Sequence, residues 1–260
     1  MTLTLSNGPL AAAAPDTVNY EITGPQHKLL FSPFPRRVRA KFGGETVVDT
    51  DHGMLLHESN ILPVLYVPVA DVRSELLTKT DHTTHCPFKG DASYWSIAAG
   101  GRTTDNSVWG YETPTDDAAW LKGHMAFYWD HLDQWFDEDD EVFGHLRDPY
   151  HRVDARPTGR HVRVSVADLV VADTRAAMVV SETGLPNRYY IPAADVVTDQ
   201  FRPSDTTTHC PYKGDTTYWT FVGDEPVEDV AWSYPTPLVD AARIAGHWSF
   251  DGDGVTVDVS

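Results

Sequence analysis

Most of the residue types that could carry out chemistry lie in one short block that occurs twice in the chain. The two copies are His85-Cys86-Pro87-Phe88-Lys89-Gly90-Asp91 and His209-Cys210-Pro211-Tyr212-Lys213-Gly214-Asp215. A cysteine nucleophile needs a nearby base or positive charge, but neighbouring residues of an extended chain point in opposite directions, so His85 is poorly placed to activate Cys86. We therefore expect the histidine and lysine of each block to orient a substrate and stabilise its negative charge. The alternative is a structural loop in which proline and glycine set two turns and the cysteine is buried.

A glutamate follows a short apolar run in each half of the chain. Glu58 ends Met54-Leu-Leu-His-Glu, and Glu182 ends Met178-Val-Val-Ser-Glu. Burial disfavours the charged form of a carboxyl group, which would raise its pKa toward a value useful for general acid–base catalysis. We expect Glu58 and Glu182 to be the acid–base residues. The alternative is a structural salt bridge to Arg39 or Arg163.

A set of aromatic and sulfur-containing residues recurs in both halves and could line a partly apolar pocket. Tyrosine and tryptophan combine large apolar surfaces with a polar group, which suits the binding of a flat or cationic molecule. Simple core packing is the other interpretation. The candidate substrate-binding residues are Tyr66, Tyr190, Tyr94, Tyr218, Trp95, Trp219, Trp109, Trp232, Cys86, Cys210, His124 and His247.

Metal binding and a disulfide are weaker interpretations of the same residues. The sets His85/Cys86/His124 and His209/Cys210/His247, each with its glutamate, have suitable donors for zinc. No Cys-x-x-Cys or His-x-x-x-His spacing supports such a site, so we expect no metal and no cofactor. A disulfide between Cys86 and Cys210 is disfavoured in the compartment we expect.

The chain is an internal repeat. Residues 38–97 align without gaps with residues 162–221 at an offset of 124, with 23 identities in 60 positions. We therefore predict an N-terminal extension (1–35), a first domain (36–144), a linker (145–158) and a second domain (159–260). The linker contains an acidic run and prolines and is predicted to be solvated. The two domains are expected to pair within the chain as a pseudo-dimer, and further oligomerisation is left open.

Short alternating segments separated by turn residues predict a mainly β protein. Val162, Val164 and Val166 alternate with polar residues, and Gly43-Gly44 has the composition of a hairpin turn. Each domain is thus predicted to be a small antiparallel β unit. The aromatic spacing within 126–136 predicts a short helix after the first domain, whereas the second copy ends in a strand-like run over 254–259.

The repeated motifs resemble a known family. Tyr-(Val/Ile)-Pro-x-Ala-Asp-Val, Thr-His-Cys-Pro-(Phe/Tyr)-Lys-Gly-Asp-x-x-Tyr-Trp and Trp-x-Tyr are similar to the bacterial and fungal family called domain of unknown function 427. The resemblance covers most of 36–136 and 159–250. It implies a small β-rich domain and no settled activity. The family also carries a nucleotidyltransferase-like label, and such enzymes need an Asp-x-Asp pair to hold Mg²⁺. Asp49-Thr-Asp51 is a superficial match to that pair, and it becomes Asp173-Thr-Arg175 in the second copy.

The charge excludes several classes of partner. A formal net charge of −18 over 260 residues argues against nucleic acid and against anionic membrane surfaces, which need clustered Lys and Arg. No apolar run approaches the length of a membrane helix, about 18 residues. The first residues lack the basic start of a signal peptide, so we expect a cytoplasmic protein.

These observations predict an enzyme that acts on a small organic molecule by general acid–base chemistry without a redox cofactor, as a hydrolase, isomerase or lyase. The alternatives are a non-catalytic module that binds or senses a small molecule and a purely structural or interaction domain. The copies differ at His57/Ser181, His82/Thr206 and Glu112/Pro235, so the two sites could differ in ligand or in activity.

Overall fold

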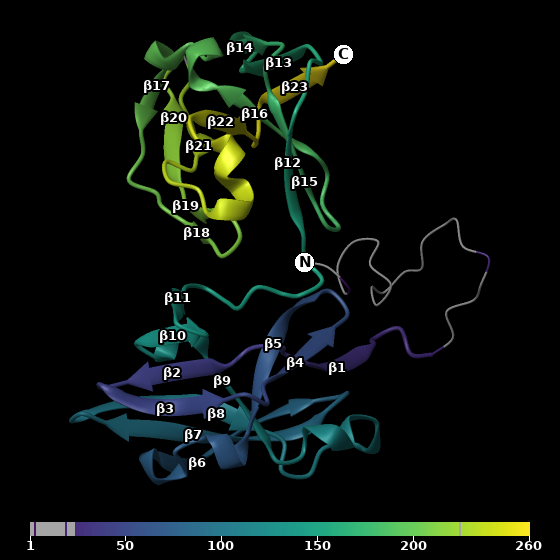
Figure 1. Cartoon of the computed structure of the whole chain (residues 1–260), viewed down its shortest axis with the longest axis vertical. Helices are drawn as coiled ribbons and strands as arrows, with labels where there is room; N and C mark the ends of the chain where they lie inside the picture. The colour runs from purple at the N-terminus through teal and green to yellow at the C-terminus, as the bar shows by residue number, and fades with distance from the viewer. Residues whose placement is uncertain (1–2, 4–18, 20–23, 224) are drawn as a thin grey trace. The chain divides into compact units, whose positions relative to one another are not determined.

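The computed structural model describes residues 3, 19, 24–223 and 225–260, and most of the expected N-terminal extension lies outside them. The chain divides into two compact units, Met1–Tyr150 and His151–Ser260. Both units consist of antiparallel sheets and short 3-10 helices (Figure 1). The prediction of two mainly β domains in tandem is therefore confirmed. Within the described residues, no helix is long and apolar enough to cross a membrane.

The first unit has two antiparallel sheets. The larger has the order β1 (Leu29–Pro33), β4 (Met54–Glu58), β5 (Ile61–Pro68), β9 (His124–Phe127), β8 (Arg102–Gly110), β7 (Gly90–Ala99) and β6 (Leu77–Cys86). The smaller has the order β11 (Asp140–Val142), β10 (Gln134–Asp137), β2 (Val38–Phe42) and β3 (Glu45–Thr50). The 3-10 helices are η1 (Val69–Asp71), η2 (Ser74–Leu76), η3 (Asp116–Leu121) and η4 (Trp129–His131).

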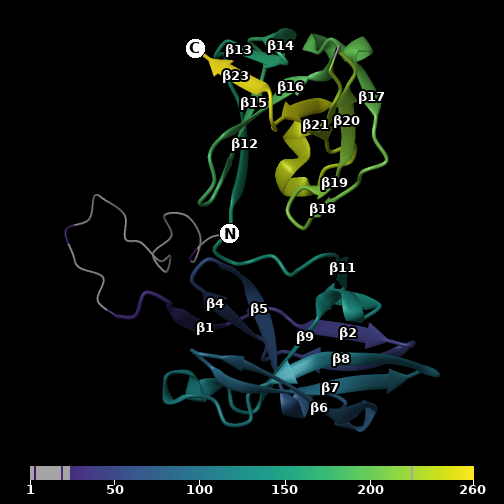
Figure 2. The ribbon, with the colours of Figure 1, turned by 180° about the vertical axis from the view of Figure 1, so that it is seen from behind.

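The second unit repeats this plan. Its larger sheet has the order β12 (Val153–Pro157), β15 (Met178–Glu182), β16 (Arg188–Pro192), β22 (His247–Phe250), β21 (Val227–Ser233), β20 (Thr217–Phe221) and β17 (Phe201–Pro203). A three-stranded sheet has the order β14 (Leu169–Thr174), β13 (Val162–Val166) and β23 (Val255–Val259). A two-stranded sheet pairs β18 (His209–Cys210) with β19 (Gly214–Asp215). The 3-10 helices are η5 (Ala193–Asp195), η6 (Thr198–Gln200) and η7 (Val239–Ile244). Strands β12 and β15 lie side by side in both views (Figures 1 and 2).

Strand alternation gives each large sheet two buried faces. In β4, Leu55 belongs to the core shared with the smaller sheet, whereas Leu56 belongs to a second cluster with Tyr66, Tyr94 and Leu121 of η3. Successive side chains of a strand point to opposite faces, which explains this division. The second unit has the same two clusters, and there η7 contributes its buried residues to the second one. The candidate site lies on the face that η3 or η7 covers.

The prediction of a short helix within 126–136 is wrong. The segment forms β9, the single 3-10 turn η4 and β10. Strand β10 pairs with β2 just as β23 pairs with β13, so this segment is the counterpart of the strand that ends the second copy. The aromatic spacing serves packing between these pieces instead, because the rings of Trp129 and Trp135 stack at 4.4 Å.

Each unit begins earlier in the chain than the sequence analysis placed it. Strand β1 lies within the expected extension, and β12 lies within the expected linker. Both are paired over five residues, β1 with β4 and β12 with β15. The expected solvated linker is also partly buried, since Leu146 is 6% exposed and packs into the first core.

Two glycine turns meet backbone to backbone in the first unit. Gly43 joins β2 to β3 and Gly100 joins β7 to β8, and both have a φ of 58°. A Cβ atom on Gly100 would lie less than 3.0 Å from the carbonyl oxygen of Gly43. Gly100 is therefore required for two reasons: its backbone is left-handed, and the turn at Gly43 leaves no room for a Cβ atom.

We predict that Gly100→Ala destabilises the first unit more than Gly101→Ala. Both residues have positive φ, but a Cβ on Gly101 would meet no atom within 4 Å. Gly101→Ala should cost about 1 kcal/mol of unfolding free energy from backbone strain alone, and Gly100→Ala more than about 2 kcal/mol. Urea denaturation of the two variants measures the difference. Equal losses would show that the two turns do not touch.

Candidate functional site

A buried ion pair joins the two most conspicuous sequence features in each unit. Lys89 Nζ donates to Glu58 Oε1, and Lys213 Nζ donates to Glu182 Oε1. Glu58 is 4% exposed and Lys89 is 9% exposed. The glutamate and the lysine that the sequence analysis selected independently, 31 residues apart, are therefore direct partners.

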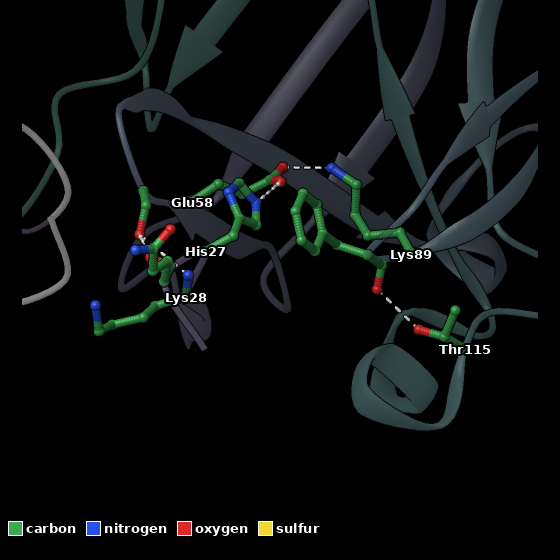
Figure 3. A network of polar contacts seen from close by, with 8 residues as sticks. His27, Lys28, Glu58, Lys89 and Thr115 are labelled. Atoms are coloured by element: carbon green, nitrogen blue, oxygen red, sulfur yellow. Dashed lines mark hydrogen bonds and ion pairs between the residues drawn. The ribbon is translucent and has the colours of Figure 1, made fainter. Parts of the chain in front are cut away.

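A histidine that the sequence analysis missed completes this arrangement. His27 Nε2 lies 3.1 Å from Glu58 Oε2, and His151 Nε2 lies 3.5 Å from Glu182 Oε2. Figure 3 shows the imidazole of His27 and the ammonium of Lys89 approaching the Glu58 carboxylate from opposite sides. We call His27–Glu58–Lys89 and His151–Glu182–Lys213 the triads of the two units.

An aromatic ring lies against the imidazole of each triad. The ring of Phe88 stacks on His27 with centroids 3.9 Å apart and an interplanar angle of 16°. Tyr212 lies 4.2 Å from His151 at 49°. The aromatic residue directly before the lysine in the repeated block thus limits where the imidazole can lie.

The pairing of β1 with β4 brings the histidine to the glutamate. Leu29 lies opposite Glu58 in the register. The Lys28 amide donates to Ser59 Oγ at 3.0 Å, and the Ser59 amide donates to the Lys28 carbonyl at 3.2 Å. In the second unit the Arg152 amide donates to Thr183 Oγ1, and the Thr183 amide donates to the Arg152 carbonyl, each at 3.0 Å. In both units, two hydrogen bonds therefore join the residue after the histidine to the residue after the glutamate.

A tight turn directs the lysine. The Lys89 amide donates to the Cys86 carbonyl at 3.3 Å, which closes a turn with Pro87 at its second position. Gly90 follows with a φ of 99°, a conformation that favours glycine. The Lys89 carbonyl accepts from the amide of Thr115, which precedes η3, and Thr115 Oγ1 donates to the Phe88 carbonyl (Figure 3). The proline and glycine of the block thus set the turn that aims the lysine at the carboxylate.

Buried tyrosines surround the ion pair. Lys89 Nζ lies 5.7 Å from the centre of the Tyr111 ring, and Lys213 Nζ lies 5.9 Å from that of Tyr234. Burial raises the pKa of Tyr66, and the neighbouring charge of Glu58 adds to the shift. Burial likewise raises the pKa of Tyr111. These hydroxyl groups stay protonated at neutral pH and can serve as hydrogen-bond donors.

The sequence-predicted aromatic residues divide between the two faces of the sheet. Those in the cluster around the triad of the first unit are Tyr66, Tyr94, Cys86 and Trp109, and Tyr111 lies in the same cluster. Those around the second triad include Tyr190, Cys210 and Trp232, and Tyr234 lies in the same cluster. Trp95 and Trp219 lie on the opposite face and pack against the other core. The Tyr218 ring lies 6.3 Å from Trp232.

The predicted histidines lie elsewhere. His85 Nδ1 is 2.7 Å from Asp91 and His209 Nδ1 is 2.7 Å from Asp215, across the hairpin. The ring of His124 lies against Phe31, and His247 bonds the Ala245 carbonyl. The zinc sets considered above are thus dispersed. The described residues hold no cluster of three or more metal-ligating side chains, and both cysteines are free.

Electrostatics around Glu182 oppose the expected role of the glutamate. Burial alone would raise the pKa of Glu182, but hydrogen bonds from His151 and Lys213 and the charges of both groups lower it to about 2. The expectation of a raised pKa is therefore wrong for this carboxyl group. It remains ionised at neutral pH and can orient an imidazole, but it holds no proton to donate.

One signal in the sequence could have revealed the missed histidines. The offset of 124 that relates residues 38–97 to residues 162–221 continues upstream of Val38. It aligns Pro25 with Pro149, His27 with His151 and Pro33 with Pro157. The histidines belong to the repeat even though most residues between these markers differ.

We predict that Lys213→Met destabilises the protein strongly at neutral pH and much less in acid. A carboxyl group with a lowered pKa contributes stability that is complete above its unfolded value of 4.5 and is lost as the pH falls toward about 2. Loss of Lys213 leaves the buried carboxylate without one partner, so the loss at pH 7 should be about 3 kcal/mol or more. Urea unfolding from neutral pH to about pH 3 measures it. The exposed Lys122→Met is the control, and a loss that does not change with pH would contradict a charged Glu182.

The comparisons with known proteins agree with the internal repeat. The family model described as a domain of unknown function (DUF427) matches the chain twice, over residues 30–138 and 154–260. No curated protein matches the chain. Both matched segments contain the glutamate and the lysine of a triad. The chain therefore belongs to the domain of unknown function 427 family and contains two copies of the domain.

Proposed function

We propose that the protein is an enzyme that transfers protons to or from a small organic molecule, with the histidine of each triad as the acid–base residue. The reaction class is hydrolysis, isomerisation or elimination without a redox cofactor. The single observation that carries this proposal is the duplication of the triad. Both units keep the histidine, glutamate and lysine in the same contacts, with an aromatic ring against the imidazole.

Stability alone is a poor reason to keep this arrangement twice. A buried ion pair contributes little net stability, because the loss of hydration offsets the attraction between the charges. Apolar side chains of similar volume would stabilise such a site equally well. The surroundings of the triads have changed between the copies, for example Phe88 to Tyr212 and Thr115 to Leu238. Retention of the charged groups amid these changes supports a chemical role.

The proposed roles follow from the donor and acceptor capacity of each group. With a proton on Nε2, His27 donates to Glu58 and presents the lone pair of Nδ1 as a base. The ionised carboxylate fixes this tautomer and stabilises the imidazolium that forms when His27 takes a proton, as in other His–carboxylate pairs. Lys89 neutralises the carboxylate, and the protonated tyrosines can bond a negative oxygen of the substrate. The His27 side chain is 18% exposed and the Phe88 residue 42% exposed, which leaves a route from solvent.

We predict that the double variant His27→Gln/His151→Gln loses catalysis. The test is to incubate the whole protein with a panel of carboxylic esters, lactones, amides and β-hydroxy acids and to detect products by mass spectrometry. At least one compound should be converted, and the rate should fall by about 100-fold or more in the double variant because general acid–base catalysis contributes that much.

The matched control is His85→Gln/His209→Gln. It also removes two histidines that pair with carboxylates, but these lie on the hairpin outside the triads. The control should retain full activity. Equal loss in both double variants, or full activity in the triad variant, would contradict the assigned role.

Non-catalytic binding is the second candidate function. The low pKa of Glu182 favours it, because a permanently ionised carboxylate beside a lysine is also a suitable fixed element of a binding site. Thermal-shift measurements on the same panel separate the two functions. Compounds that stabilise the protein without being converted, and that lose this effect in the triad variant, would favour a binding module.

A further inference from the structure

A second histidine of β4 is buried on the opposite face from the triad of the first unit. His57 is 0% exposed, and neither ring nitrogen has a hydrogen-bond partner among the described residues. Its neighbour Glu58 points to the other face, as alternation along a strand requires. Across the sheet, His57 lies opposite the apolar Leu30 of β1. A buried imidazole without partners is costly, so its presence calls for an explanation.

The segment that leads to the second unit covers this histidine. Asp148 is 5% exposed, and its Oδ2 lies 4.0 Å from His57 Nδ1. Asp148 Oδ1 accepts the Tyr150 amide at 2.8 Å, and the Tyr150 ring lies 5.5 Å from the imidazole. Leu146 of the same segment is buried in the first core. We call residues 143–150 the connecting segment.

The charge on His57 follows from this environment. Burial lowers the pKa of His57, and the nearby carboxylate of Asp148 offsets only part of that shift. The ring is therefore neutral at neutral pH. Other ionisable groups of the connecting segment are His145, whose Nδ1 bonds the Leu146 carbonyl, Arg147 and Tyr150. Strand β1 contributes no ionisable group opposite His57, because its residue at that position is Leu30.

The second unit lacks the feature. Ser181 replaces His57, and its hydroxyl bonds the Asn187 side chain at 2.7 Å on an exposed surface. The triad is thus shared by the two units, whereas an exposed serine occupies the position of His57 in the second unit. This contrast ties His57 to the segment and not to the triad chemistry.

We propose that the connecting segment, which covers the buried ring of His57, acts as a proton-operated clasp: it stays on β4 while His57 is neutral and is released when His57 takes a proton, because burial of the charged ring outweighs its attraction to Asp148. A protonated ring can be hydrated only if the segment lifts away from β4. The segment runs from Asp148 and Tyr150 directly into His151, the first residue of the second triad. The connecting segment therefore ends at the residue directly before the second triad.

The pH dependence has a definite sign. A histidine whose folded pKa lies below its unfolded value takes up more protons in the unfolded or released state. The clasp is therefore strongest above the unfolded value of 6.5 and weakens as the pH falls below it. A pKa lowered by one pH unit corresponds to about a tenfold change in the equilibrium between the held and the released segment.

Hydrogen–deuterium exchange of the whole protein tests the proposal. After correction for intrinsic rates, the amides of residues 145–148 and 150 should lose protection by about tenfold or more from about pH 7.5 to about pH 5. In His57→Ser, which installs the residue of the second copy, their protection should no longer depend on pH. The control His52→Ser removes an exposed histidine that also lies near a carboxylate, Asp71, and should keep the wild-type pH response.

An NMR titration keeps the proposal testable if His57→Ser does not fold. The ring signal of His57 in the wild-type protein should titrate below 6.5, and it should move lower still in Asp148→Asn because the offsetting charge is gone. A His57 signal that titrates at or above 6.5, an unchanged value in Asp148→Asn, or pH-independent protection of 145–150 in the wild type would each overturn the clasp.

Discussion

The burial of a carboxylate at the end of β4 constrains more of this fold than any other interaction. A buried charge without partners is unfavourable by several kcal/mol, so the glutamate needs donors on both of its oxygens. Lys89 reaches Glu58 from the turn after β6, and His27 reaches it from the start of β1. Three segments that are far apart in the sequence must therefore keep their register together. The proline and glycine of the repeated block follow from the same requirement, because they shape the turn that aims the lysine.

The two faces of β4 carry two independent kinds of chemistry. Glu58 faces the tyrosines and η3, where it belongs to the proposed catalytic triad. His57, its neighbour in sequence, faces the connecting segment, where it touches Asp148. The sheet between them keeps each charge with its own partners. The triad recurs in the second unit, whereas Ser181 replaces His57 there.

Sequence patterns predicted the β architecture and the duplication because both depend on local alternation and on self-similarity. They also selected Glu58 and Lys89, since a glutamate after an apolar strand and a lysine in a repeated turn are visible locally. Their direct contact depends on strand order, which no local pattern reveals. The pKa of Glu182 was expected in the wrong direction because burial can be inferred from the sequence, but the number of donors around a carboxylate cannot. The helix expected within 126–136 failed because aromatic residues at helical spacing also fit a strand, a single turn and a second strand.

The differences between the units bear on what the triad is for. The aromatic ring beside the imidazole is Phe88 in one unit and Tyr212 in the other, and the residue that precedes the covering 3-10 helix is Thr115 in one and Leu238 in the other. Both positions keep their geometry, since the Leu238 amide bonds the Lys213 carbonyl as the Thr115 amide bonds that of Lys89. The side chains therefore differ between the units at these two positions, where only the shape of the site matters. They are the same at the three triad positions, where charge and the ability to carry a proton matter. A purely structural role would require some donor on the second carboxylate oxygen, but an amide or a hydroxyl group would serve, and an imidazole is not required. The histidine is thus the component that structural needs explain least well, and it is the one to which we assign the proton transfer.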